Sequence, residues 1–170
     1  MASSEVLIDA IDRIQQVVHR AIKGASTELL TYRPDADANS VAWLIWHLTR
    51  VQDDHVADAF GTQQVWTSGG WANRFALPFD DAATGYGQSS DDVAAVGVGA
   101  DLLGGYHDAV HDRTVELLKT VTDDDLARVV DESWNPPVTL GVRLVSLIAD
   151  DLQHVGQASY VRGLAERAGR

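Results

Sequence analysis

The sequence predicts an all-α protein, a four-helix bundle with one long crossover loop between its second and third helices. Three observations lead to this fold class. Four segments carry apolar residues at steps of three and four, no segment keeps the alternation of a half-buried strand, and one aromatic-rich segment, 62–88, separates the second helical stretch from the third. Because 170 residues are about one domain long, we expect residues 1–170 to form a single domain.

The first two helices are predicted from Ser4 to about Ala25, and from Asn39 or Ser40 to Gly61. The first repeats apolar residues along one face, namely Val6, Ala10, Ile14, Val17 and Ala21. The second has a polar residue suited to cap its start, a stretch rich in tryptophan and leucine, and a glycine suited to end it. The first segment therefore predicts an amphipathic helix, and the second predicts a helix that packs firmly.

The crossover between the second and third helices is longer than loops inside compact domains usually are. It contains five aromatic side chains among its glycines, namely Trp66, Trp71, Phe75, Phe79 and Tyr86. So many aromatics argue against disorder. Two interpretations stay open: the segment covers one end of the core, or it forms a lid that faces a substrate.

The third helix is predicted from Ser89 to Val121, and the fourth from about Thr139 to Ala168, with a short helical turn at 123–128 between them. Glycines weaken the first half of the third helix, which predicts either close packing or a break there; they are Gly97, Gly99, Gly104 and Gly105. In the fourth helix one stripe repeats every seven residues, at Leu140, Leu147, His154 and Val161. That stripe predicts that His154 points into the bundle.

Composition excludes several classes of function. A formal net charge of -12 with scattered basic residues disfavours binding to nucleic acid or to an anionic membrane surface. The absence of cysteine removes disulfides, zinc thiolates and cysteine nucleophiles, so any thiol chemistry would use an external thiol. The first residues do not form a secretion signal, and no stretch is apolar enough to span a membrane, so we expect a cytoplasmic protein.

Asp150 and His154 stand one helical turn apart, a spacing that aims a carboxylate and an imidazole at the same point. His47, in the apolar stretch of the second helix, is the best candidate for a third ligand, and Asp151 is an alternative to Asp150. Two histidines and one carboxylate would leave coordination positions open, as in catalytic zinc and non-haem iron sites. The competing interpretation is a buried, hydrogen-bonded Asp–His pair without a metal.

The other histidines carry weaker signals. His107 and His111 also have i, i+4 spacing, but aspartates flank them, and we expect a solvated face. His55 fits the core arc of the second helix and is expected to be structural, while His19 has no predicted partner. The motifs of serine hydrolases, P-loops, dinucleotide folds and His-Glu-x-x-His helices are absent from the sequence.

Three motifs together resemble the DinB-like superfamily, and more narrowly its branch of thiol-dependent enzymes, which includes mycothiol-dependent maleylpyruvate isomerases. They are WLIWHLTR at 43–50, GWANRFALPF at 70–79 and DDLQHVGQ at 150–157. The resemblance implies a four-helix bundle with one metal ligand on the second helix, matched by His47, and two on the last, matched by Asp150 and His154. At the middle position the family usually has His or Glu, where this chain has the shorter Asp.

The leading hypothesis is a divalent-metal-dependent S-transferase that joins a low-molecular-weight thiol, of the mycothiol type, to a small electrophile. Zinc is the first choice of metal, with nickel, iron or manganese as alternatives. Gln157 and Arg50 are candidates to orient thiol or substrate, and Arg143 and Arg162 are weaker candidates to bind anionic groups. Metal-assisted hydrolysis on the same ligands is one alternative. A non-catalytic bundle that binds a small ligand or a second protomer is another, and a homodimer is compatible with each of these.

Overall fold

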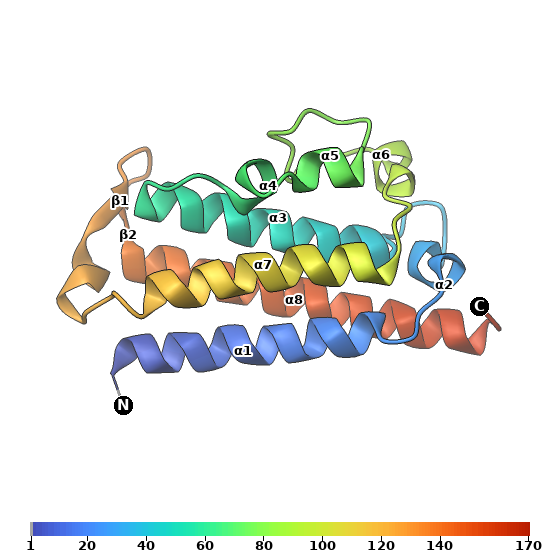
Figure 1. Ribbon diagram of the computed structural model, residues 1–170, viewed down its shortest axis with the longest axis horizontal. Helices are drawn as coiled ribbons and strands as arrows, with labels where there is room; N and C mark the ends of the chain where they lie inside the picture. The colour runs from blue at the N-terminus through green and yellow to red at the C-terminus, as the bar shows by residue number, and fades with distance from the viewer. Residues whose placement is uncertain (1) are drawn as a thin grey trace.

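The computed structural model describes residues 2–170, in which four long helices lie side by side as a bundle (Figure 1). They are α1 (Ser3–Ile22), α3 (Val41–Phe60), α7 (Ala100–Leu118) and α8 (Leu140–Arg167). Helices α1 and α8 run in one direction and α3 and α7 in the other. Helix α3 packs mainly on α8 and α7, and α1 packs on the same two helices, so α1 and α3 are diagonal partners. The predicted all-α bundle is confirmed.

The ends of α3 and α8 follow local capping rules. The side chain of Ser40 accepts a hydrogen bond from the amide of Trp43, and that of Thr139 accepts one from the amide of Val142. Gly61 ends α3 in the left-handed conformation, with φ of 62°. These caps fix where the two helices begin.

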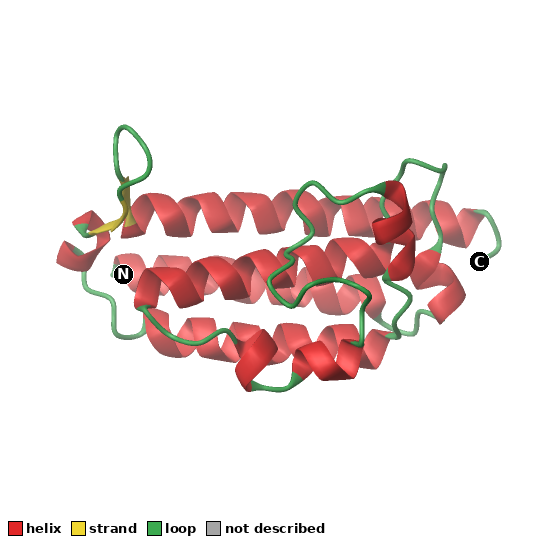
Figure 2. Ribbon diagram, turned by 90° about the horizontal axis from the view of Figure 1, so that it is seen from above, coloured by secondary structure: helices red, strands yellow, loops and turns green. Residues whose placement is uncertain are grey.

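The crossover from α3 to α7 is more ordered than a loop. It contains α4 (Val65–Ser68), α5 (Trp71–Phe75) and α6 (Ser90–Ala95), and the expected continuous helix from Ser89 is broken between α6 and α7 (Figure 2). The glycine-containing stretch 96–99 is not helical, so of the two alternatives that its glycines left open, close packing or a break, the break is found at this stretch.

The aromatic residues of the crossover differ in burial, which bears on whether the segment covers the core or forms a lid. Trp66, Trp71 and Phe75 are buried and pack around the ring of Tyr106 on α7. Gly105 permits this approach, since a Cβ there would lie 3.0 Å from the Trp71 ring. These three side chains therefore cover the core, whereas Tyr86 is 95% exposed.

The remaining elements are short. Helix α2 (Thr27–Thr31) follows α1, and a 3-10 helix, η1 (Asp124–Ala127), forms the turn predicted at 123–128. Strands β1 (Val129–Asp131) and β2 (Val138–Thr139) pair antiparallel before α8. The sequence predicted no element at this hairpin, because two- and three-residue strands are too short to show an alternating pattern.

Two histidines expected on the surface are buried. His107 is 1% exposed and His111 8%. The Nδ1 atom of His107 lies 3.1 Å from the hydroxyl of Thr49, and Nε2 of His111 lies 2.8 Å from Asp12. The prediction failed because α7 is packed between α1 and α3 and buries a broad face. Burial lowers the pKa of His107 to about 3.

No helix within residues 2–170 combines the length and the apolar character needed to cross a membrane.

Candidate metal centre

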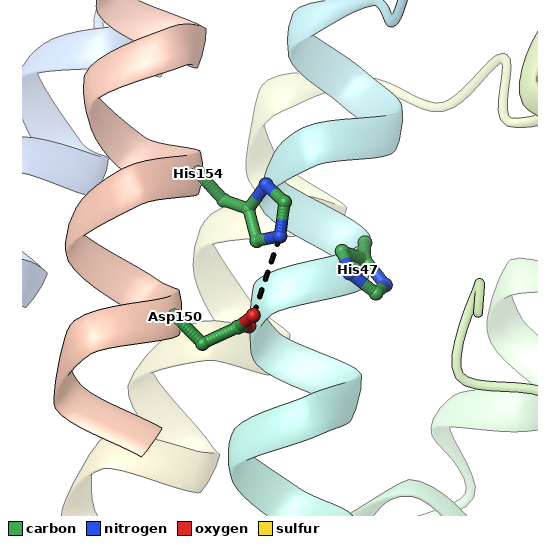
Figure 3. A group of neighbouring side chains, drawn as sticks. All are labelled: His47, Asp150 and His154. Atoms are coloured by element: carbon green, nitrogen blue, oxygen red, sulfur yellow. Dashed lines mark ion pairs between the residues drawn. The ribbon is translucent and has the colours of Figure 1, made fainter. Parts of the chain in front are cut away.

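His47 on α3 and Asp150 and His154 on α8 come together in the groove between the two helices (Figure 3). Each offers one ligand atom, and the three atoms lie within 4.8 Å of one another. The i, i+4 spacing puts Asp150 and His154 on one side of α8, and the packing of α8 on α3 brings His47 to them. The structure therefore joins the three residues that the sequence singled out as ligands.

Both imidazoles are oriented through Nδ1. In His47 this nitrogen lies 2.5 Å from the carbonyl oxygen of Thr84, and in His154 it lies 3.1 Å from Oε1 of Gln157. Because these oxygens can only accept, each Nδ1 carries the proton and donates it. Each Nε2 is then free to present a lone pair, which is the arrangement that orients histidine ligands in metal sites.

The carboxylate of Asp150 completes the donor set. Its Oδ1 lies 3.5 Å from Nε2 of His154, and its Oδ2 is buried without a hydrogen-bond partner among the described residues. The contact with His154 lowers the pKa of Asp150, and the same contact raises the pKa of His154. Burial lowers the pKa of His47, which favours its neutral form.

These residues fit a divalent ion. Zinc binds imidazole nitrogen at about 2.0–2.1 Å and carboxylate oxygen at about 2.0–2.2 Å. The three donor atoms lie within 4.8 Å of one another, so small side-chain rotations would bring all three to one ion. The unpartnered Oδ2 of Asp150 would gain the partner that it lacks. With three protein ligands, a fourth position stays open for a small molecule.

A cavity of about 300 Å³ adjoins the cluster. His47 and Asp150 line it together with His55, Ser146 and Tyr86. His55 was expected to be a structural core residue, but it borders this cavity, and its Nδ1 has no partner among residues 2–170. Burial lowers the pKa of His55, and the charge of Arg143 lowers it further. Its position two turns beyond His47, on the same side of α3, was the sequence signal for this role.

The segment 81–88 holds His47 from the side opposite α8. Trp43 stacks on the His47 ring at 4.6 Å, and its Nε1 donates to Oε1 of Gln88 at 2.8 Å. Gly85 passes so close that a Cβ there would lie 2.6 Å from Nδ1 of His47. Backbone contact through Thr84 and Gly85 thus fixes one candidate ligand, His47. The sequence could not show this contact, because every residue type carries a backbone carbonyl.

Arg50 lies behind this segment and away from the cavity. Its guanidinium is fully buried and donates to the carbonyl oxygens of Ala83 at 3.1 Å and Asp81 at 3.2 Å. It also lies 3.8 Å from Asp53, whose carboxylate accepts hydrogen bonds from the first amides of α4. Burial raises the pKa of Asp53. The contacts of Arg50 are those of a residue that anchors the crossover.

Of the remaining candidates for the site, Gln157 contacts the cluster, whereas Arg143 and Arg162 have partners elsewhere. Gln157 contacts His154 directly. Arg143 forms an ion pair with Asp131 at 2.7 Å. Arg162 donates to carbonyl oxygens at the carboxyl end of α1, those of Arg20, Ala21 and Lys23, so it is not brought to the cluster.

Helix α8 turns its neighbouring aspartates in different directions. Asp151 is fully buried, and neither of its oxygens has a hydrogen-bond partner among the described residues. Burial raises its pKa well above the usual range, which favours the neutral carboxyl. The expected inward stripe through His154 is shifted: the buried stripe passes through Asp151, and the His154 side chain is 19% exposed at its edge. Seven residues fall about 20° short of two turns, so a seven-residue line drifts around the helix.

Comparison with known proteins gives the same fold. A model of the DinB superfamily matches residues 10–158. Among solved structures, the chain is similar to a conserved protein from Enterococcus faecalis, with 30% sequence identity and a TM-score of 0.91, over 100% of this chain and 99% of that one. No curated protein matches the sequence.

Proposed function

Because the chain belongs to the DinB superfamily, we propose that it is a metal-dependent enzyme whose ion is held by His47, Asp150 and His154. The observation that carries this proposal is the convergence of three donor atoms within 4.8 Å, with both imidazoles held through Nδ1. A hydrogen-bonded pair without a metal would not need a third residue from another helix. Nor would it leave Oδ2 of Asp150 buried and unpartnered.

The reaction that we propose is the transfer of a small-molecule thiol to a small electrophile. A divalent ion with an open position lowers the pKa of a bound thiol and keeps it as thiolate at neutral pH. The chain has no cysteine, so the sulfur must come from outside. A thiol of the mycothiol type follows from the resemblance of the three motifs to thiol-dependent members of the superfamily. Zinc suits a nitrogen, oxygen and sulfur ligand set best, with nickel, iron and manganese as alternatives.

The residues around the cluster have definable tasks in this proposal. Thr84 and Gln157 hold the two imidazoles in one orientation, and the cavity beside Asp150 receives the reactants. His55, whose pKa burial lowers, offers this cavity a neutral imidazole that can accept the proton released by a thiol. Tyr86 lies at the exposed side of the same cavity, where it can contact the substrate.

Metal content tests the first part of the proposal. Protein purified without chelator or affinity-tag metal should contain close to one equivalent of a divalent ion by elemental analysis. The His47→Ala and His154→Ala variants should fall below about a tenth of an equivalent. His19→Ala is the matched control, because His19 is an exposed histidine on α1 that pairs with Asp108. Wild-type protein that stays free of metal even after zinc is added would refute the metal centre.

A panel of low-molecular-weight thiols with an electrophilic reporter tests the second part. We expect consumption of the electrophile that requires both thiol and metal and that His154→Ala abolishes. Turnover that needs metal but no thiol would instead indicate hydrolysis on the same ligands. A protein that binds metal but shows neither activity would contradict the transferase assignment without removing the metal site.

A further inference from the structure

The outer face of α8 is apolar along almost the whole helix. Val142 is 57% exposed, Val145 62%, Leu152 48% and Tyr160 67%. Small residues fill the positions between them, so that one stripe contains Val142, Val145, Ala149, Leu152, Gly156, Tyr160 and Gly163. At 100° per residue these positions lie within a narrow sector opposite the buried stripe. Helix α8 forms one edge of the bundle (Figure 2), and the exposure of these residues places the sector on the outer side of the helix.

Charged residues avoid this face although the chain carries a formal net charge of -12. Those of α8 up to Glu166 point elsewhere: Arg143 pairs with Asp131, Asp150 faces His154, and Arg162 reaches α1. The outer face of α1, by contrast, carries an exposed Asp9–Arg13 ion pair. An exposed apolar face about six turns long, without a charge, is typical of an interaction surface.

The spacing of the stripe is that of a helix–helix seam. Val142, Ala149, Gly156 and Gly163 recur every seven residues, and Val145 and Leu152 repeat at the same interval between them. Alternating steps of three and four residues are what a helix presents to one partner helix that crosses it at a small angle. The stripe therefore fits another long helix.

The same face carries both a protruding side chain and a matching hollow. Tyr160 protrudes near one end of the stripe. Near the other end Val145 lines a mainly apolar cavity of about 280 Å³, together with Val6, Leu7 and Leu126. If a second α8 runs antiparallel about a two-fold axis between Leu152 and Gln153, Tyr160 of each copy lies opposite Val145 of the other. The same axis sets Val142 against Gly163 and Ala149 against Gly156, which lets the helices approach closely.

We propose that the outer face of α8 binds the α8 of a second copy of this chain, antiparallel, with Tyr160 of each copy in the cavity beside Val145 of the other. A two-fold interface needs a surface that is complementary to itself, and this face meets that requirement in both shape and charge. A partner with a basic surface would find no acidic residue on this stripe, whereas two acidic copies can approach through a face without charge. An aromatic anchor in an apolar pocket is the usual centre of such an interface.

Sedimentation equilibrium of the purified full chain tests the proposal. Wild type should have the mass of two chains, and its dimer should strengthen as salt is added, because salt screens the repulsion between acidic copies. Tyr160→Ala should weaken the dimer about 30-fold or more, and Ala149→Arg should give monomer. Ala94→Arg is the matched control, an exposed alanine on α6 that is not part of the stripe, and should stay dimeric. The positions are exposed, so thermal denaturation should show that each variant is folded.

A cysteine introduced at the axis tests the register, since the chain has no other thiol. Leu152→Cys should form a disulfide-linked dimer under mild oxidation, and Ala94→Cys should not under the same conditions. A wild-type monomer at every concentration would overturn the proposal. So would a dimer that neither Tyr160→Ala nor Ala149→Arg weakens, because a different face would then make the contact. These outcomes do not depend on metal content or activity.

Discussion

Replacing Gly85 by alanine should weaken metal binding far more than the same change at Gly87. Both glycines have positive φ, 99° and 72°, so alanine costs about 1–3 kcal/mol of backbone strain at either position. Only at Gly85 does the new Cβ meet a ligand, 2.6 Å from Nδ1 of His47; at Gly87 nothing lies within 4 Å. The clash must move either the segment or the imidazole, which breaks the hydrogen bond from His47 to Thr84. Loss of such a partner lowers metal affinity about 10- to 100-fold.

Zinc titration by calorimetry measures this difference, and thermal denaturation of both metal-free variants checks that they lose similar stability. We expect Gly87→Ala to bind zinc within about threefold of wild type, and Gly85→Ala to bind it at least tenfold more weakly. A Gly85→Ala variant that binds zinc as tightly as wild type would show that contact between segment 81–88 and His47 does not position this side chain. Equal losses of affinity would attribute the effect to backbone strain alone.

Three further predictions concern buried polar groups. His107→Gln should lessen the loss of stability on acidification. The pKa of His107 is about 3 in the folded protein, below its usual 6.5, so the free energy of unfolding of wild type should fall by up to about 5 kcal/mol as pH drops from 6.5 to 3. Urea unfolding at several pH values measures this difference. Asp151→Asn should have the opposite pH dependence, because the raised pKa of Asp151 makes wild type less stable as pH rises. The free energy of unfolding of the variant should therefore exceed that of wild type by more as pH increases, while metal content stays unchanged. Arg50→Lys should cost about 2–4 kcal/mol in unfolding experiments and expose segment 81–88 to protease, because lysine cannot make all the hydrogen bonds of the guanidinium to Asp81 and Ala83.

Local signals in the sequence were sufficient for the long helices and for the pairing of Asp150 with His154. The caps at Ser40 and Thr139 are set by residues within one turn, so their side chains could be recognised without knowing the fold. The break before α7 was also visible, in the glycines of 96–99. Local signals were not sufficient for His47, because packing brings this residue to the site from a distant helix, and the resemblance of the three motifs indicated it in addition.

What the sequence did not predict depends on neighbours that are distant in the chain. His107 and His111 looked solvated because aspartates flank them, but the position of α7 between α1 and α3 buries them. The carbonyl of Thr84 belongs to every residue type equally, so its contact with His47 cannot be read from composition. His55 shared a side of α3 with His47, yet its role at the cavity followed only once segment 81–88 was in place.

The choice between Asp150 and Asp151 shows how the packing of α3 decides the chemistry. The two carboxylates belong to consecutive residues and are separated by about 100° around α8. That angle leaves Asp150 facing the groove with His47 and His154, while it turns Asp151 into the core, where no donor meets it. The contact with His154 lowers the pKa of Asp150, whereas burial raises the pKa of Asp151, so the anionic form is favoured at Asp150 and disfavoured at Asp151. A carboxyl must be deprotonated to bind a metal, so the side of α8 that faces α3 determines which aspartate could bind the ion that we propose.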